Sequence, residues 1–470
     1  MSETVERLRR ELGEAAVSIE ASVRAEHARD WWMLSEIDDF EGRAPVGPTA
    51  VVSPGSTEEV AAVLRIARET STPIVPYGGG SGVCGGVRID RPAIALSTRR
   101  LAGLVELSDR DLLATFRAGT MGGDAERRVQ EDGLTIGHWP QSIELSTVGG
   151  WVATRAAGQY STGYGNIEEL LFGLEAVLPD GTIVRTRSTP RASAGPDLRQ
   201  LFLGSEGTLG VVTEATFSLR PLPEASQGSA FSFADFGAGL DAIRQLVREG
   251  WRPPVVRLYD EAESARSFGA YCPEGRALLL LLHEGMEAAV AAERAGCAVR
   301  AEAAGGQPAP AEAVQDWLGH RNRVPGFREF LEKGIVVDTI EIGATWDRVL
   351  PVYEAVTRSL REVEGILIAS GHSSHSYRSG TNLYFTFLAR PEDPSRLSEI
   401  YRECWRRTID ATISQGGGIA HHHGIGRIRR DALPSEIGAS GVALLRAVKR
   451  ALDPDDLLNP GVLLPDEDRP

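Results

Sequence analysis

The sequence has no long apolar segment and no paired cysteine motif. Its longest uninterrupted apolar run, Ala277–Leu282, is far shorter than the roughly 20 residues that a membrane-spanning helix needs. The N-terminal segment after Met1 is charged, and it lacks the apolar core and the cleavage site of a signal peptide. The four cysteines lie far apart, which is typical of reduced thiols. We therefore expect a cytoplasmic protein.

Basic residues are fewer than acidic ones: 50 Lys and Arg stand against 65 Asp and Glu, which gives a net charge of −15. This balance argues against a nucleic-acid partner, because phosphate backbones require basic surface. The net negative charge does not exclude a small anionic substrate, since a few local arginines can bind one. The sequence has no HExxH motif and adjacent histidines rarely share one metal, so no metal site is predicted.

The chain of 470 residues is long enough for two or three domains. We expect a helical segment over residues 1–45, an α/β region over 46–222, a second one over 223–415, and a histidine loop with a C-terminal segment over 416–470 that returns to the first region. Strands of the second region are expected at 231–233, 255–259, 277–282, 336–341 and 382–387, with helices at 241–249 and 346–363 and a surface connection at 300–313.

A glycine-rich loop, Pro76–Gly82, follows a predicted strand and opens a GxGxxG pattern from Gly80 to Gly85. A Rossmann site would require a helix directly after the loop. Here the next residues carry strand signals and a proline, so a Rossmann site is not expected. The glycines can instead form a backbone nest for an anion, or only a tight β-turn.

Two further segments combine glycines with small hydroxyl residues. Gly137–Gly158 contains the paired Gly149 and Gly150, and Gly204–Glu214 runs into a predicted strand. Small residues of this kind let the backbone approach a ligand closely.

These three segments resemble the FAD-binding domain of the vanillyl-alcohol oxidase and p-cresol methylhydroxylase superfamily over about residues 45–222. The resemblance implies an α+β fold, with a two-subdomain FAD-binding domain and an α/β cap domain built on an antiparallel sheet. It implies that FAD is bound by Pro76, Tyr77, Gly78, Gly79, Gly80, Ser81, Gly82, Gln141, Ser142, Ser146, Thr147, Gly149, Gly150, Thr154, Glu206, Gly207, Val211 and Val212. The first loop has no histidine and Cys84 lies beyond its turn, so we expect non-covalent FAD.

Candidate catalytic residues each have an ordinary structural alternative. The run His421–His423 follows a flexible glycine stretch and could be a polar surface loop. Tyr384 could be a core aromatic residue, and Arg257, in an apolar strand, could face solvent or a cavity. Arg328, on a predicted helix, would usually be solvated.

Taken together, runs such as Gly137-His-Trp-Pro, Gly380-Thr-Asn-Leu-Tyr-Phe and His421-His-His-Gly-Ile-Gly resemble the alkylglycerone-phosphate synthase family. The resemblance implies an exchange of an acyl for an alkyl group through an adduct at flavin N5, without net oxidation. It assigns catalysis to Tyr384, His421, His422, His423 and His138, and substrate binding to Arg328 and Arg257, with Arg378 standing where the family has an acid. A Tyr–His set suits proton transfer near neutral pH.

Two other classes of flavoprotein remain possible for this sequence. A flavin dehydrogenase or oxidase of 2-hydroxy acids shares the FAD domain, and His372 could ligate a metal there, but His422 replaces the acid expected in such a site. A non-enzymatic flavin-binding scaffold is the third class.

The resemblance further implies a homodimer. The predicted helix 312–333, with Trp317, could touch a membrane surface or simply be solvated. The final tripeptide, Asp468-Arg469-Pro470, is not a peroxisomal address.

Overall fold

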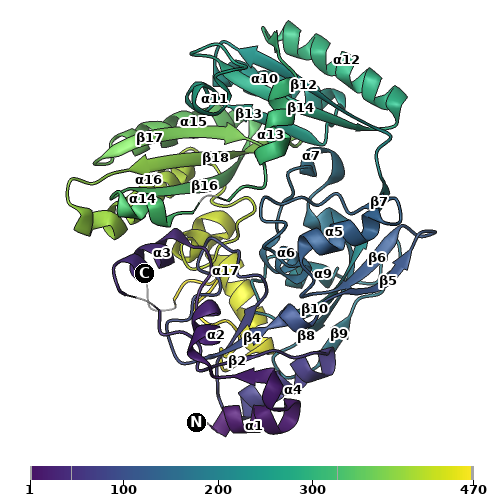
Figure 1. Ribbon diagram of the computed structural model, residues 1–470, viewed down its shortest axis with the longest axis vertical. Helices are drawn as coiled ribbons and strands as arrows, with labels where there is room; N and C mark the ends of the chain where they lie inside the picture. The colour runs from purple at the N-terminus through teal and green to yellow at the C-terminus, as the bar shows by residue number, and fades with distance from the viewer. Residues whose placement is uncertain (1–2, 44, 325, 467–470) are drawn as a thin grey trace.

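The computed structural model describes residues 3–43, 45–324 and 326–466, so the final tripeptide lies outside the described residues. A small parallel sheet lies at the bottom of Figure 1, a five-stranded antiparallel sheet lies to its right, and a large antiparallel sheet with its helices forms the top. We call the first two units the FAD-binding half and residues 223–415 the cap. This is the α+β architecture that the sequence predicts.

The first subdomain is built around a four-stranded sheet of order β1-β2-β4-β3 in which β2, β4 and β3 are parallel. Ser56 caps the helix that follows β2 by accepting from the Glu59 N–H, and the Glu59 carboxylate accepts from the Gly55 N–H. The elements are α1 (Glu3–Leu12), β1 (Val17–Ser18), α2 (Ala21–Glu26), α3 (Met33–Phe40), β2 (Ala50–Val52), α4 (Thr57–Glu69), β3 (Ile74–Tyr77) and β4 (Ile94–Ser97).

The second subdomain contains a five-stranded antiparallel sheet of order β5-β6-β10-β8-β9. Its elements are β5 (Leu104–Ser108), β6 (Leu113–Arg117), α5 (Gly122–Gln130), β7 (Leu134–Thr135), α6 (Val148–Thr154), α7 (Ser161–Tyr164), α8 (Ile167–Leu170), β8 (Leu171–Val177), β9 (Ile183–Arg185), α9 (Arg199–Phe202), β10 (Val211–Ser218) and β11 (Arg220–Pro221). Strand β11 pairs with β7 and leads the chain into the cap.

The cap is a seven-stranded antiparallel sheet of order β15-β12-β14-β13-β17-β18-β16. Its elements are β12 (Ala225–Phe233), α10 (Phe236–Glu249), β13 (Val255–Tyr259), α11 (Glu261–Phe268), β14 (Ala277–Gly285), α12 (Glu287–Ala303), β15 (Gln307–Ala309), α13 (Glu312–His320), α14 (Arg328–Glu332), β16 (Val336–Thr345), α15 (Trp346–Arg361), β17 (Ile366–Ser373), β18 (Gly380–Ala389) and α16 (Leu397–Ser414). The chain ends with α17 (Leu433–Leu452), which is broken at Gly438.

The leucine run of β14 is apolar throughout because both faces of this strand are buried. Leu279 and Leu281 pack with α10, α12, α15 and α16 in the largest core. Leu278, Leu280 and Leu282 pack on the opposite face with α11, α13 and Tyr160 of the FAD-binding half. Successive side chains of a strand point to opposite faces, so the sheet's second face turns toward the other half of the molecule.

Three sequence expectations for the cap are wrong in detail. Strands β15 and β17 were not predicted, and residues 300–313 are partly helix and partly β15 rather than a surface connection. The predicted helix 312–333 ends at His320, before the separate α14. Trp317 is buried against the sheet, so this aromatic side chain is not presented to a membrane.

The two chain ends join the halves of the molecule. Trp32, beside α3, donates from Nε1 to the Tyr401 hydroxyl at 3.0 Å, and that hydroxyl donates to Asp338 of β16 at 2.8 Å. At the other end, the Ile74 N–H donates to the Leu457 carbonyl, so the C-terminal segment extends the edge of the small sheet. The C-terminal segment thus returns to the first subdomain.

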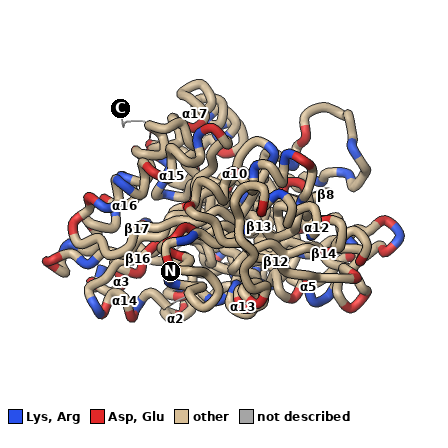
Figure 2. The backbone as a smooth tube through the Cα atoms, turned by 90° about the horizontal axis from the view of Figure 1, so that it is seen from above, with Lys and Arg blue, Asp and Glu red and all other residues tan. Residues whose placement is uncertain are grey.

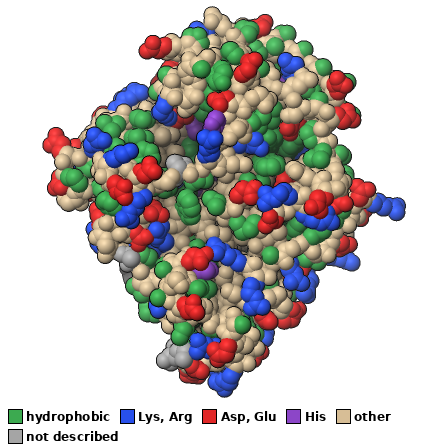
Figure 3. Space-filling view, in the orientation of Figure 1, with side chains coloured by type: hydrophobic (Ala, Val, Ile, Leu, Met, Phe, Trp, Pro, Cys, Tyr) green, Lys and Arg blue, Asp and Glu red, His purple; other side chains and the backbone are tan. Residues whose placement is uncertain are grey.

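The surface carries both signs of charge. Residues coloured blue and red both occur along outer helices such as α14 and α16 (Figure 2), and side chains of both signs are interspersed over the face shown in Figure 3. Within residues 3–43, 45–324 and 326–466, no helix combines the length and apolar character needed to cross a membrane.

We expect Trp32→Ala to lower the free energy of unfolding by about 3–5 kcal/mol, because a buried aromatic side chain at the contact between halves is lost. Trp32→Phe should cost about 1 kcal/mol, since chiefly the Tyr401 hydrogen bond is removed. Thermal and urea unfolding measure both changes. Val46→Ala, at a side chain that is 61% exposed, is the control, and a Trp32→Ala variant as stable as the control would contradict this packing role.

Candidate functional site

A cavity of about 830 Å³ lies between the FAD-binding half and the cap. Every residue predicted to bind FAD lines it: Pro76, Tyr77, Gly78, Gly79, Gly80, Ser81, Gly82, Gln141, Ser142, Ser146, Thr147, Gly149, Gly150, Thr154, Glu206, Gly207, Val211 and Val212. The cap contributes Arg257, Trp317, His372, His375 and Tyr384 from the opposite side, and His422 and His423 come from the loop after Gly418.

The glycine loop approaches its neighbours more closely than any side chain would allow. A Cβ on Gly78 would lie 2.5 Å from Thr147 Oγ1, and one on Gly79 would collide with the Leu145 carbonyl. Gly80 has φ of +71°, which disfavours other residues. No helix follows the loop, so its contacts to a ligand come from backbone N–H groups rather than from a Rossmann helix.

These walls fit FAD. One end offers the close-packed glycine backbone suited to a diphosphate, and Ala118, Trp151, Val211 and Val212 supply apolar surface for a ring system. Many lining residues of the FAD-binding half are glycine, alanine, serine or threonine, which lets their backbone approach a ligand closely.

Cys84 is the candidate thiol for a covalent link in the first loop. It is 3% exposed, and burial raises the pKa of its thiol well above the ordinary value. The protonated thiol is a weak nucleophile, which agrees with the prediction of non-covalent FAD.

Glu206 joins the FAD-binding half to the histidine loop. Its carboxylate accepts from the Ile425 N–H at 2.7 Å and from the Gly426 N–H at 2.9 Å. Burial raises the pKa of Glu206 to about 7 despite these donors. The side chain predicted to lie along the cofactor therefore also fixes the loop above it.

Glu341 of β16 positions the three histidines. Its Oε1 accepts from the backbone N–H groups of His421, His422 and His423 at 3.2, 3.0 and 2.7 Å. Its Oε2 is paired with Arg429, and both side chains are fully buried. Burial opposes the charge, but Arg429 and the histidines hold the pKa of Glu341 well below its usual range.

Tyr384 and His423 form a polar chain inside the cavity. Thr339 Oγ1 donates to the Tyr384 hydroxyl at 3.1 Å, which leaves the Tyr384 O–H free for His423 Nε2 at 3.3 Å. His423 Nδ1 lies 3.1 Å from Glu341 Oε2, off the line of an ideal hydrogen bond. Burial raises the pKa of Tyr384, so its hydroxyl stays protonated.

A second chain links Glu263, His372 and Arg257. Arg257 Nη2 lies 3.0 Å from His372 Nε2, and His372 Nδ1 lies 2.8 Å from Glu263 Oε2. A guanidinium only donates, so Nε2 must accept and Nδ1 carries the proton. Burial and Arg257 lower the pKa of His372, which agrees with this neutral tautomer.

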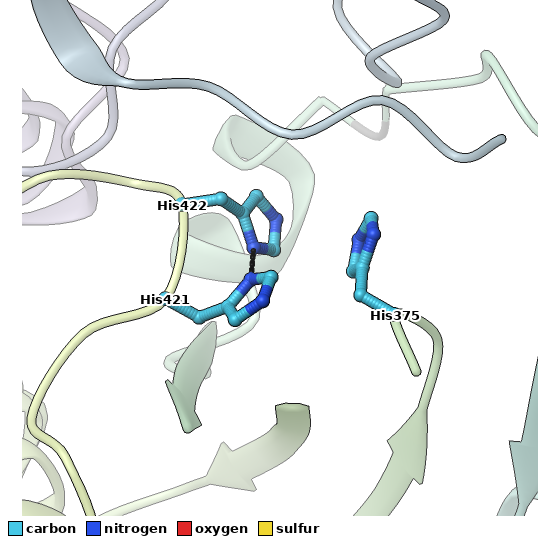
Figure 4. Close-up of side chains that lie close together, drawn as sticks. All are labelled: His375, His421 and His422. Carbon is cyan, nitrogen blue, oxygen red and sulfur yellow. Dashed lines mark hydrogen bonds between the residues drawn. The ribbon is translucent and has the colours of Figure 1, made fainter. Parts of the chain in front are cut away.

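His421 and His422 lie opposite His375, which follows the end of β17 (Figure 4). The Nδ1 atoms of His421 and His422 are 2.9 Å apart. His375 and His422 line the cavity, whereas His421 sits behind His422. Figure 4 shows the His375 ring facing the other two across a gap.

Besides His421, three predicted site residues lie away from the cavity. His138 is completely buried behind its wall, with its ring centroid 4.6 Å from that of Trp151. Arg328 has 61% of its side chain exposed and an ion pair with Glu332, and Arg378 is exposed in a turn. These positions were transferred from a resemblance without knowledge of burial, and the structure does not bring them to the other site residues.

Sequence reasoning missed Glu341, Arg429, Glu263 and Arg321. A signal existed for Glu341, because Ile340 and Ile342 flank it in an apolar strand. Arg321 follows α13 and lines the cavity, with its guanidinium over Trp139 and Trp317 and its buried Nε without a partner. No local pattern marks Arg321 or Arg429.

The fold and the glycine-lined cavity define an FAD-binding protein of the p-cresol methylhydroxylase type. A model of the FAD binding domain matches residues 48–187, and a model of the C-terminal domain of FAD linked oxidases matches residues 222–463. The chain belongs to the FAD-linked oxidase family, and FAD is its cofactor.

Individual relatives differ in their described activity. The uncharacterized FAD-linked oxidoreductase YgcU of Escherichia coli K12 is 34% identical, over 89% of this chain and 90% of that protein. The alkyldihydroxyacetonephosphate synthase of Trypanosoma brucei brucei is 29% identical, over 98% of this chain and 80% of that protein. The glycolate oxidase subunit GlcD of Bacillus subtilis is 27% identical, over 88% of each chain.

Solved structures support the fold. A crystal structure of an alkyldihydroxyacetonephosphate synthase superposes with a TM-score of 0.82 at 24% identity, covering 98% of this chain and 86% of that chain. Substrate-bound p-cresol methylhydroxylase superposes with a TM-score of 0.79 at 18% identity, covering 100% of this chain and 97% of that chain.

We expect Gly79→Ala to weaken FAD binding at least tenfold, because the new methyl group must displace the Leu145 carbonyl or the loop. The flavin released by acid precipitation reports the FAD content, and the same step tests non-covalent attachment. Gly86→Ala is the matched control, since its Cβ would meet only Glu206 Oε2 at 3.5 Å. Equal FAD content in both variants would count against the close-packed loop.

We expect stability to fall steeply as the pH is lowered from about 6.5 to 4. Burial lowers the pKa of His138 to about 3 and of His421 to about 4, and it also lowers those of His372, His375 and His422. In this window the unfolded chain takes up protons that the folded chain excludes, so stability rises with pH by up to about 1.4 kcal/mol per pH unit for each histidine.

Unfolding midpoints measured between pH 4 and pH 8 test this expectation. His138→Leu removes one such histidine. The slope of the free energy of unfolding against pH should therefore fall by the contribution of one proton, up to about 1.4 kcal/mol per pH unit. An unchanged slope in this variant would show that His138 does not resist protonation.

Proposed function

We propose that the protein exchanges the acyl group of an acylated dihydroxyacetone phosphate for an alkyl group, as an FAD-dependent enzyme. The observation that carries this proposal is the Tyr384–His423 pair, which faces the FAD-binding residues across one cavity. Exchange without net oxidation requires a proton to leave and return to the substrate. An imidazole can accept the proton that leaves, and the protonated phenol beside it can return one, so the pair covers both directions.

Bound FAD supplies an electron-accepting ring at which a carbon beside a carbonyl can react. The chain supplies the proton transfer. Tyr384 donates toward His423 Nε2, Thr339 fixes the direction of the hydroxyl, and Glu341 fixes the histidine through its backbone N–H. The Tyr384 ring stacks on His372 with centroids 4.9 Å apart, which holds its position when the hydroxyl moves a proton.

Arg257 and Arg321 are the proposed ligands of the anionic end of the substrate. Both guanidiniums lie over the Trp317 ring, at 5.4 and 5.9 Å from its centroid. Arg257 uses Nε for Tyr259 and Nη2 for His372, so further N–H groups remain for a phosphate. The family resemblance assigned substrate binding to Arg328 and Arg257, so Arg321 takes the place of the exposed Arg328 in this proposal.

Oxidation of a 2-hydroxy acid is the second candidate. Neutral His372, oriented by Glu263, could act as the base, provided that Arg257 Nη2 leaves His372 Nε2 and binds the carboxylate of the substrate instead. The similarity to YgcU, described as an FAD-linked oxidoreductase, and to a glycolate oxidase subunit supports the same interpretation. The synthase similarity extends over more of this chain, 98% against 89% for YgcU and 88% for the glycolate oxidase subunit.

We expect Tyr384→Phe to lower turnover by about 10²–10⁴-fold with acyl-dihydroxyacetone phosphate and a fatty alcohol, because the acid–base group is removed while the ring remains. FAD content should not change. The measurement is release of fatty acid and formation of the alkyl product. Tyr271→Phe, which removes a hydroxyl outside the cavity lining, is the matched control.

Anaerobic spectra separate the two candidates. If a 2-hydroxy acid bleaches the flavin and the electrons then pass to a dye, oxidation replaces acyl exchange as the proposed function. Equal exchange rates in the Tyr384→Phe and Tyr271→Phe variants would remove Tyr384 from the chemistry.

A further inference from the structure

His375, His421 and His422 form a cluster that acid–base catalysis does not explain. One ring nitrogen of each lies within 4.8 Å of those of the other two. His421 itself does not line the cavity. Figure 4 shows the three rings converging on one point from two separate segments, the chain after β17 and the histidine loop.

We propose that these three imidazoles bind a divalent transition-metal cation of the zinc type. Three neutral imidazoles suit Zn²⁺ and its neighbours rather than Mg²⁺ or Ca²⁺, which prefer oxygen. In a tetrahedral zinc site with bonds of about 2.1 Å, the ligand nitrogens lie about 3.4 Å apart. Small side-chain rotations bring the present cluster to that spacing.

The facing Nδ1 atoms of His421 and His422 support the proposal. At 2.9 Å they share one proton as a hydrogen bond, or they both direct lone pairs at a cation. Neutral rings with free lone pairs are what metal binding requires.

The outer nitrogens of two rings already have partners of the kind that orient metal ligands. His375 Nδ1 lies 2.6 Å from Ser161 Oγ, and His421 Nε2 lies 2.7 Å from the Tyr377 hydroxyl. Such contacts fix the tautomer and leave the other nitrogen free for the metal. His375 Nε2 is then free for the cation, whereas His421 Nδ1 contacts His422 Nδ1, and a bound cation would replace this contact.

The backbone on both sides of the cluster is fixed. Glu341 Oε1 accepts from the N–H groups of His421 and His422, and Asn382 Oδ1 accepts from the His375 N–H at 3.0 Å. Ligands held in this way form a site without large rearrangement.

The open position of such a cation would face the cavity, because His375 and His422 line it. Three protein ligands with one open position are typical of catalytic zinc. The substrate class that fits is an oxygen anion, a carboxylate or a phosphate, next to Arg257. Metal binding itself is independent of whether the reaction is acyl exchange or oxidation.

Metal analysis of the tag-free, FAD-loaded protein tests the site. After dialysis against Zn²⁺ we expect one zinc per chain, and X-ray absorption should show three imidazole nitrogens at about 2.1 Å. His375→Ala should weaken zinc binding at least 100-fold. Ser161→Ala should weaken it about 10- to 100-fold, since only the orienting contact is lost.

His320→Ala is the matched control, because this exposed histidine on α13 is outside the cluster, and it should retain zinc. FAD content and the unfolding midpoint report whether each variant folds, and His422→Gln replaces His375→Ala if the latter does not. The proposal is overturned if the wild type takes up no zinc in excess Zn²⁺. It is equally overturned if the folded ligand variants bind zinc as the wild type does.

Discussion

The carboxylate of Glu341 determines where the reactive side chains lie. It is fully buried, yet three backbone N–H groups and Arg429 satisfy its oxygens. Burying two charges is unfavourable unless their donors and acceptors are paired. Here the carboxylate of Glu341 on β16 orders the histidine loop, which has no regular secondary structure. Because removal of one partner from a buried pair costs about 3–5 kcal/mol, the loop and β16 behave as one unit. Glu206 then ties this unit to the segment Gly204–Glu214 of the FAD-binding half.

The two halves bind their ligands by different means. The FAD-binding half offers backbone and small residues, so its requirement is the absence of side chains at positions such as Gly79. The cap offers Tyr384, His372 and Arg257, whose chemistry depends on individual atoms. Substitution in the cap can therefore change the reaction while the cofactor site stays the same. This separation accounts for relatives described as a synthase and as an oxidase subunit that share one architecture.

The cofactor site was predictable from the sequence because its signals are local. The run Pro76–Gly82 and the pair Gly149 and Gly150 carry their conformational requirement within a few residues, and all of them line the cavity. The candidate catalytic contacts are not local: Glu341 lies 80 residues from His421, and Arg321 meets Trp139 only in the folded chain. Strands β15 and β17 were missed because one is short and the other mixes polar and apolar residues on both faces. His138 has a suggestive neighbourhood in the sequence, but full burial separates it from the cavity.

The charges that line the cavity explain how an acidic protein can favour an anionic substrate. Burial raises the pKa of Asp30 to about 6, that of Glu206 to about 7, and that of Asp338 as well. These acids therefore carry less negative charge near neutral pH, whereas the guanidiniums of Arg257 and Arg321 remain charged. The net charge of −15 is distributed over the surface, where salt screens it within about 8 Å. Arg257 and Arg321 line the cavity beside Trp317, and a cation on the three histidines would add positive charge there. The anionic substrate proposed above would thus be selected locally, by the cap rather than by the protein's overall charge.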